Sequence, residues 1–379
     1  MKVAYVLNST DVFGGATKSF TAMLYTLMDK GIEPLVVMPD GNGLKQELDA
    51  KGIATLVLNY RPNTYPYHSC LKDYLLWIPR LIARRIVNCR ATRELYKHIT
   101  MCDLVHTNVS VIDIGKRAAD KLRIPHVYHF REYADLDFGE YYFPCRRRFL
   151  SSVSYSIFIT RGIQEYNHLQ SSPSSCVVYN PIATGDKIPD FDTQGTYLLY
   201  AGRLEETKGI EDLLKAYANA STHLPLYVAG SFLKASYENK VMGMVSKLHL
   251  TERVRFLGNR KDILPLMAKA KATIIPSHFE GFGRVMAEAM FQGCIVIGRN
   301  TSGTKEQFDN GLSYTGAEIG FRFSTISELA EIINNIETFP TEELSLMRKR
   351  AFQTVKHFYT YENSSKSIFS FYEQINSSK

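Results

Sequence analysis

Residues 276–290 read Pro-Ser-His-Phe-Glu-Gly-Phe-Gly-Arg-Val-Met-Ala-Glu-Ala-Met, and the rest of the chain can be ordered around them. They follow a short apolar run, residues 272–275, which predicts a buried parallel strand. A turn with two glycines and Glu280 comes next, and a helix running to about Phe291 carries a second acid, Glu288. A strand end, a glycine turn and a helix N-terminus together form a corner that suits a phosphate or a sugar.

The same alternation of strand and helix fills the chain, which predicts doubly wound, largely parallel α/β sheets. A polar stretch rich in Gly, Asp and Pro, residues 180–195, indicates a linker. We therefore expect two doubly wound domains, 1–182 and 183–356, followed by a C-terminal helical segment, 357–379. The predicted strands are 2–7, 34–38, 55–58, 103–106, 126–130, 156–159 and 176–179, then 197–200, 226–229, 254–257, 272–275 and 294–297.

Composition is that of a globular protein, with 45% hydrophobic and 22% charged residues among 379. No apolar run approaches the roughly eighteen residues of a transmembrane helix. The apolar start of the chain is too short for a signal peptide. Six cysteines are scattered without a CxxC pair, so neither a zinc site nor a disulfide framework is expected, and a reducing cytoplasm is favoured.

The net charge of +7 is unevenly distributed. Six Lys or Arg and one acid, Glu94, lie between Arg80 and Lys97, and a second cluster is Arg146-Arg147-Arg148. Such excess fits an anionic membrane surface or a phosphorylated substrate, or equally a solvated helix surface. No nucleic-acid-binding module is recognisable, so nucleic acid is not an expected partner.

The second half holds two groups of candidate residues. Arg203 and Lys208 lie in the loop after its first strand, where two cations at a helix N-terminus can hold a diphosphate. Glu280 and Glu288 border the same predicted cleft, because eight helical positions bring the second acid about 80° round from the first. The alternatives are solvated loop cations, a surface helix acid, and an acid facing the helix dipole.

The first half offers two further features. Gly14 and Gly15 follow the first strand and let a helix N-terminus approach a ligand. The loop lacks G-x-G-x-x-G, so a nicotinamide cofactor is not supported. His129 ends an apolar strand, where it could bind a substrate hydroxyl, move a proton, or serve as a hydrogen-bonded structural histidine.

Together these residues resemble the family 4, group 1 type glycosyltransferases, retaining enzymes of the GT-B fold that use nucleotide sugars. The resemblance spans most of the chain, and the Arg203–Lys208 loop and the Glu280–Glu288 spacing are its most specific parts. It implies two Rossmann-like domains facing across a cleft, with acceptor bound by the first and donor by the second. It also implies that the C-terminal helix, 357–379, crosses back to the first domain. It also implies a role in bacterial capsule, O-antigen or exopolysaccharide synthesis.

The resemblance further implies a role for each site residue. Arg203 and Lys208 would bind the donor diphosphate, and Glu280 would contact the donor sugar. The backbone of Gly281, Phe282 and Gly283 would lie beside that sugar, Glu288 would hold the ribose, and His129 would lie near the transferred sugar. Gly14 and Gly15 would let the first helix approach the diphosphate. No metal or cofactor is implied; the donor would be UDP- or GDP-linked, and the acceptor an oligosaccharide or lipid-linked saccharide.

Two departures from the family pattern concern the donor side. The loop 229–233 lacks a second glycine and a proline, and Lys305 stands where family members often have proline. Two other functions remain open: a non-catalytic nucleotide-sugar-binding partner subunit, and a sugar-nucleotide epimerase of GT-B shape.

Overall fold

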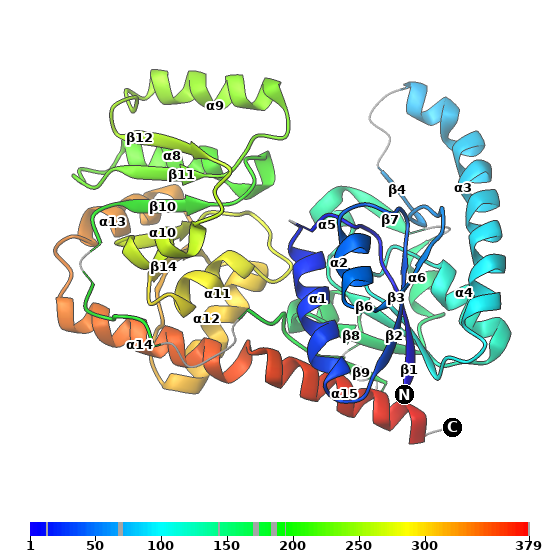
Figure 1. Ribbon diagram of the computed structural model, residues 1–379. Helices are drawn as coiled ribbons and strands as arrows, with labels where there is room; N and C mark the ends of the chain where they lie inside the picture. The colour runs from blue at the N-terminus through cyan, green and yellow to red at the C-terminus, as the bar shows by residue number, and fades with distance from the viewer. Residues whose placement is uncertain are drawn as a thin grey trace. The chain divides into compact units, whose positions relative to one another are not determined.

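The computed structural model describes residues 1–12, 14–66, 71–142, 145–169, 174–182, 188–193 and 195–377 (Figure 1). The chain forms two compact units, one of Met1–Pro181 with Tyr361–Lys379 and one of Ile182–Thr360. The predicted domain limits, after residues 182 and 356, lie beside these boundaries. Cys70 and much of the predicted linker, residues 183–187 and 194, lie outside the described residues.

The first domain is built on a seven-stranded parallel sheet in the order β3-β2-β1-β5-β6-β8-β9. Its central strands β5 and β6 are fully buried, and β1 is buried after its first residue, as the near-continuous apolar runs predict. An antiparallel pair, β4 with β7, stands apart from this sheet. The strands are β1 Lys2–Val6, β2 Glu33–Met38, β3 Ala54–Val57, β4 Thr64–Pro66, β5 Leu104–Thr107, β6 His126–Phe130, β7 Glu140–Tyr142, β8 Tyr155–Phe158 and β9 Ser175–Val177.

Helices cover this sheet, and the last helix of the chain is one of them. α15 inserts Ile368, Phe371, Tyr372 and Ile375 into the core formed by β1, β2 and α1, so the tail helix belongs to the first domain. The helices are α1 Gly15–Met28, α2 Leu44–Ala50, α3 Leu71–His98, α4 Ile114–Leu122, α5 Asp135–Phe138, α6 Arg146–Leu150, α7 Arg161–Tyr166 and α15 Tyr361–Ser377.

The second domain has a six-stranded parallel sheet in the order β12-β11-β10-β13-β14-β15. The strands are β10 Leu198–Ala201, β11 Leu226–Ala229, β12 Val254–Gly258, β13 Ala272–Ile275, β14 Ile295–Arg299 and β15 Phe321–Phe323. Its helices are α8 Ile210–Ala218, α9 Ala235–Lys247, α10 Ile263–Lys269, α11 Arg284–Phe291, α12 Ser302–Thr315, α13 Ile326–Asn335 and α14 Thr341–Phe358, with a 3₁₀ turn η1 at Glu206–Lys208.

Two parallel, doubly wound domains confirm the predicted fold class. The predicted strands lie within one or two residues of the observed ones, and 126–130, 226–229 and 272–275 agree residue for residue. Three short strands, β4, β7 and β15, were not predicted. They have three residues each, too few to show a periodic pattern.

Candidate functional site

In the second sheet the order in which strands are added reverses at β10. The strands β11 and β12 lie on one side of it, and β13, β14 and β15 lie on the other. The carboxyl ends of strands at such a switch point form the usual ligand crevice of an open α/β sheet. The loop after β10 carries Arg203 and Lys208, and the loop after β13 carries Glu280. The fold therefore brings the predicted donor-side residues of two distant sequence segments to one edge of the sheet.

Lys208 and Glu280 meet at this edge. The Lys208 ammonium donates a hydrogen bond to Glu280 Oε1 at 2.9 Å, and each side chain is only 20% exposed. Partial burial limits solvent screening, so this pair interacts more strongly than an exposed one. Lys208 is thus a paired cation and not a solvated loop charge, and Glu280 faces a lysine at the crevice.

Backbone contacts hold the two loops against each other. The His278 N–H donates to the Thr207 carbonyl at 2.9 Å. Gly209 adopts φ +69°, and a Cβ there would lie 2.2 Å from the Pro276 carbonyl oxygen. Only glycine fits this position, because both the positive φ and the close approach exclude a side chain.

Hydrogen bonds from α12 hold the loop from Glu280 to Gly283 in place. The Gly303 N–H donates to the Glu280 carbonyl at 2.9 Å, and the Gln307 side-chain amide donates to the carbonyls of Phe282 and Gly283 at 2.5 and 3.1 Å. Gly283, at φ +84°, precedes α11. Gln307 was not predicted, because no motif marks it and its role depends on the packing of α12.

Glu288 lies on α11, as predicted, with its side chain 21% exposed. Arg284, one turn earlier, donates to its Oε1 at 3.1 Å. The carboxylate is therefore a half-buried, paired acid.

Arg203 differs from Lys208 in its exposure. Its side chain is 56% exposed and pairs with Glu205 at 3.2 Å. Its backbone carbonyl accepts a hydrogen bond from the buried Tyr200 hydroxyl at 2.8 Å. The structure fixes the loop but leaves the guanidinium at the surface, so the solvated-cation alternative stays open for Arg203.

In the first sheet the switch point lies between β1 and β5. Gly14 and Gly15 follow β1 and begin α1, and the Gly14 N–H donates to the Asp11 carbonyl at 3.1 Å. A Cβ on Gly14 would lie 3.2 Å from that carbonyl oxygen, so the turn is tight. The predicted glycine turn is present at this edge of the sheet.

His129 ends β6 and is almost fully buried, at 2% exposure. Its Nδ1 lies 3.3 Å from an Arg131 guanidinium nitrogen and 3.2 Å from His106 Nε2, and His106 Nδ1 in turn lies 2.5 Å from the Tyr372 hydroxyl. Arginine can only donate, so His129 Nδ1 accepts and the ring proton sits on Nε2. Among the described residues that Nε2 has no hydrogen-bond partner.

Burial governs the ionisation of this cluster. It lowers the pKa of His106 to about 3, and Arg131 adds to the effect. Burial, with Arg131 and His106, also holds the pKa of His129 well below its usual value. His129 is therefore a neutral hydrogen-bond donor near neutral pH, which favours ligand binding over proton transfer.

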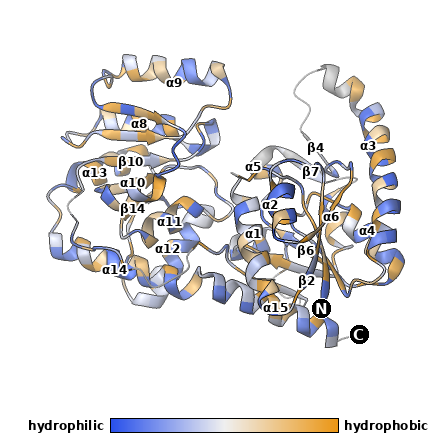
Figure 2. Cartoon of the chain, viewed as in Figure 1, coloured by the Kyte–Doolittle hydropathy of each residue, from blue (hydrophilic) through white to orange (hydrophobic). Residues whose placement is uncertain are grey.

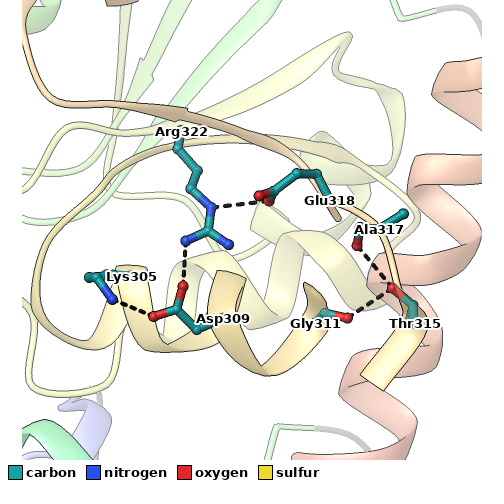
Figure 3. A network of polar contacts seen from close by, with 7 residues as sticks. All are labelled: Lys305, Asp309, Gly311, Thr315, Ala317, Glu318 and Arg322. Atoms are coloured by element: carbon teal, nitrogen blue, oxygen red, sulfur yellow. Dashed lines mark hydrogen bonds and ion pairs between the residues drawn. The ribbon is translucent and has the colours of Figure 1, made fainter. Parts of the chain in front are cut away.

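Lys305, one of the two departures from the family pattern, forms an ion pair within α12. It pairs with Asp309 at 2.5 Å, and Arg322 bridges Asp309 and Glu318 at 2.5 and 3.0 Å (Figure 3). Burial opposes the charge on Asp309, but bonds from Lys305 and Arg322 hold its pKa below the usual value. This chain of charges ties α12, and hence the support of the Glu280 loop, to β15.

In the described part of the chain no helix is long and apolar enough to cross a membrane. Nor do three or more His, Cys, Asp or Glu side chains there gather as a metal site would need.

Two Rossmann-like domains, each built on a parallel sheet, are the architecture of the GT-B class of fold. Solved structures with a similar fold match this chain over nearly its whole length. Anabaena Alr3699/HepE in complex with UDP-glucose has a TM-score of 0.75, 21% identity, and full coverage of both chains. WaaG, a glycosyltransferase involved in lipopolysaccharide biosynthesis, has a TM-score of 0.64 and 17% identity, over 96% of this chain and 98% of that one.

The family signal lies in the second domain. Residues 183–354 match the family "Glycosyl transferases group 1". This match confirms the group 1 glycosyltransferase part of the resemblance. An N-acetylgalactosaminyltransferase of Campylobacter jejuni acting on a diphospho-undecaprenol substrate is 31% identical over 143 residues, 36% of this chain and 38% of that protein. Glycogen synthase of Mycobacterium tuberculosis is 32% identical over 119 residues, 30% and 28% of the two chains. The matches thus span about a third of these curated relatives.

Proposed function

We propose that this protein is a retaining, family 4 glycosyltransferase that moves a hexosyl or related sugar from a nucleotide-diphosphate sugar to a saccharide acceptor. The observation that carries the proposal is the Lys208–Glu280 pair at the switch point of a domain matching the group 1 glycosyltransferases. A half-buried cation beside a carboxylate, at the end of a parallel sheet, suits a ligand with both phosphate charge and sugar hydroxyls.

Each residue has a role in this proposal. Lys208 and Arg203 bind the donor diphosphate and offset the charge that develops as it leaves. Glu280 accepts hydrogen bonds from the donor sugar, beside the backbone of residues 281–283, and Glu288 accepts from the ribose. His129, Gly14 and Gly15 keep the roles that the resemblance implies. No metal or cofactor is part of the proposal.

The transfer step breaks the bond between the sugar's anomeric carbon and the diphosphate oxygen and forms one from that carbon to an acceptor oxygen. Attack from the face of the leaving group retains the anomeric configuration. The acceptor proton passes to the departing diphosphate, so atoms and charge balance without a protein base. Lys208, by stabilising the diphosphate, lowers the barrier to the bond-breaking part of this step.

The substrates of similar proteins support the substrate classes of this proposal. A UDP-glucose complex among the similar structures supports a UDP sugar, and an "O-antigen chain mannosyltransferase B" of Escherichia coli supports a surface polysaccharide acceptor. A diphospho-undecaprenol substrate in the Campylobacter relative supports a lipid-linked acceptor. The proposal therefore includes a cytoplasmic enzyme at the inner membrane face, with the segment from Arg80 to Lys97 and Arg146–Arg148 as contacts.

The direct test of donor binding is a thermal-shift screen against UDP-, GDP- and ADP-sugars. A true donor at a hundredfold excess over its Kd should stabilise the protein by about 2.7 kcal/mol. The absence of a shift with every nucleotide sugar would refute the proposal.

The test of catalysis uses Lys208→Ala and Glu280→Ala. Each should lower transfer by about 10²–10³, because a preorganised charge is lost from the reaction site. Lys240→Ala is the matched control, because it removes a different ion pair of the same domain. In that pair Lys240 Nζ lies 2.7 Å from Glu211 Oε1. Near-normal turnover of either site variant, at matched circular dichroism, would contradict the assigned roles.

The two other functions give distinct results in the same assays. A partner subunit would bind a donor but transfer to no acceptor, and an epimerase would release a changed sugar nucleotide without an acceptor. Either outcome would overturn transferase activity while leaving donor binding intact.

A further inference from the structure

Arg299 is a charged residue at the end of an otherwise apolar strand. β14 carries hydrophobic residues along most of its length (Figure 2), and Arg299 is its last residue. The carboxyl end of β14 lies beside that of β13, because the two strands pair in parallel and Ile275 lies opposite Gly298. The Arg299 side chain, 14% exposed, therefore lies against the loop that leads to Glu280.

One edge of the Arg299 guanidinium bonds two different elements. Its Nε donates to the Pro276 carbonyl oxygen at 2.9 Å, and its Nη2 donates to Asp212 Oδ2 at 2.6 Å. Pro276 begins the loop after β13, and Asp212 lies in the first turn of α8, four residues after Lys208. The planar fork of arginine fixes the directions of both bonds, so Arg299 sets the position of one element relative to the other.

Two further contacts accompany these bonds. The Pro276 carbonyl that accepts from Arg299 is the one that packs against Gly209, where no Cβ would fit. His278, on the same loop, places its Nε2 3.4 Å from Asp212 Oδ2. We call the bonds of Arg299 to Pro276 and Asp212 the Arg299 bridge.

We propose that Arg299 and Asp212 are positioning residues for the reaction, because the Arg299 bridge holds Lys208 in register with Glu280. The inference rests on the proposed function, in which Lys208 binds the donor diphosphate and Glu280 the donor sugar. Neither Arg299 nor Asp212 is assigned a contact with the donor. Loss of the bridge leaves both site residues present but frees their loops to move apart, and a misplacement of about 1 Å at a reaction site can cost about a hundredfold in rate.

Energetics favour a positioning role over a purely stabilising one. The Arg299 and Asp212 side chains are 14% and 17% exposed, so the ion pair is half-buried. Taking two charges out of water offsets much of their mutual attraction, and such a pair adds little net stability while it fixes a direction in space. The bridge lies at the carboxyl edge of the sheet, beside the loops of Lys208 and Glu280, where a ligand depends on that direction.

The experiment is a double-mutant cycle of Arg299→Gln with Lys208→Ala. It uses the nucleotide sugar that gives the largest thermal shift, and it measures release of the nucleotide diphosphate with water or a saccharide panel as acceptor. Arg299→Gln alone should lower kcat about tenfold or more and change the donor KM less than about twofold. In Lys208→Ala the same change should cost less than about twofold, because the residue that it positions is gone.

A second pair of variants tests the carboxylate side of the bridge. The Asp212→Asn amide oxygen can still accept from Arg299, whereas Asp212→Ala removes the acceptor. Asp212→Asn should therefore retain more of the wild-type kcat than Asp212→Ala. If Arg299→Gln does not fold at the assay temperature, as judged by circular dichroism, this pair alone decides.

The matched control is Arg253→Gln. Arg253 is another half-buried arginine of the second domain: its Nη2 donates to the Thr222 carbonyl at 2.8 Å, and its guanidinium lies 4.5 Å from the centre of the Tyr217 ring. It immediately precedes β12 and so lies at the amino end of that strand, away from the site loops. Its kcat should match that of wild type.

Three results would overturn the inference alone: equal fold losses from Arg299→Gln with and without Lys208, a loss of kcat no larger than that of Arg253→Gln, or an Asp212→Asn no more active than Asp212→Ala. A wild type that responds to no nucleotide sugar would overturn the proposed function and this inference with it. Donor binding without turnover would overturn transferase activity, and with it any positioning role in the reaction.

Discussion

At the scale of single residues, His129 shows how burial selects one chemical role among several. A histidine at a strand end could bind, move a proton, or only support the fold. Arg131 and His106 both point at Nδ1, which leaves Nε2 as the protonated nitrogen. The neutral ring cannot act as a strong acid near pH 7, but it can offer one N–H in a fixed direction.

This assignment predicts a nuclear magnetic resonance signature. In ¹⁵N spectra of the imidazoles, His129 should remain a neutral Nε2–H tautomer between pH 5 and 8, because its pKa is well below the usual range. Tyr372→Phe removes the hydroxyl that bonds His106 Nδ1, and His129 should still keep its Nε2–H tautomer in this variant, because Arg131 still donates toward His129 Nδ1. A His129 ring that titrates near pH 6.5, or an Nδ1–H tautomer in wild type, would disprove the assignment.

The sequence predicted where His129 lies but could not predict its partners. Its place at the end of an apolar run follows from local periodicity. His106 and Tyr372 are 23 and 243 positions away, and only the sheet order and the docking of α15 bring them together. The same holds for Lys208 and Glu280, 72 positions apart: each was a candidate alone, but their ion pair depends on β10 lying beside β13.

At the scale of elements, α12 acts as a support for the Glu280 loop. The approach is close because Gly303 has no side chain: a Cβ there would lie 2.7 Å from the Phe282 carbonyl oxygen and 2.8 Å from that of Gly281. Any larger residue must push the loop or the helix away, so the position of Glu280 depends on a glycine 23 residues later in the chain.

We therefore expect Gly303→Ala to destabilise the protein by roughly 1–3 kcal/mol and to weaken donor binding, since overpacking shifts the backbone that carries Glu280. Gly243→Ala is the control. Its Cβ would meet nothing within 4 Å in the middle of α9, so it should stabilise by about 0.4–1 kcal/mol. Urea unfolding and donor titration of both variants provide the measurement. Equal stability and equal donor affinity would show that the loop does not depend on this contact.

The strands of the two main sheets were predicted to within one or two residues, except for β15, which was not predicted. β10, β11 and β13 lie in the middle of a buried sheet, where both faces are apolar and the run of hydrophobic residues is unmistakable. β15 and the β4–β7 pair lie at an edge or outside the main sheets, where tertiary contacts decide.

At the scale of the whole molecule, the two domains differ in how they hold histidine. His106, His126 and His129 are buried in the first domain, at 0–2% exposure. In the second domain His223, His249, His278 and His357 are all exposed. A buried neutral histidine binds its proton more readily once the chain unfolds. Acid should therefore act on one domain first.

The pKa values give the direction in which pH changes the stability of the first domain, and the pH range over which the change occurs. Burial lowers the pKa of His106 to about 3 and those of His126 and His129 well below 6.5. Their contribution to stability is complete above pH 6.5, the unfolded value, and is lost as pH falls below it. At pH 5 His106 alone should cost the first domain roughly 2 kcal/mol.

Hydrogen exchange, corrected for the intrinsic pH dependence of amide exchange, should show the difference between pH 7.5 and pH 5. Peptides from β5 and β6 should lose protection, while those from β10 and β13 keep it. His126→Gln should reduce the loss, because its amide can still bond the Thr107 hydroxyl, now 2.8 Å from His126 Nε2, and cannot titrate. Equal loss in both domains, or none in the first, would mean that protonation of the buried histidines does not control the acid stability of this protein.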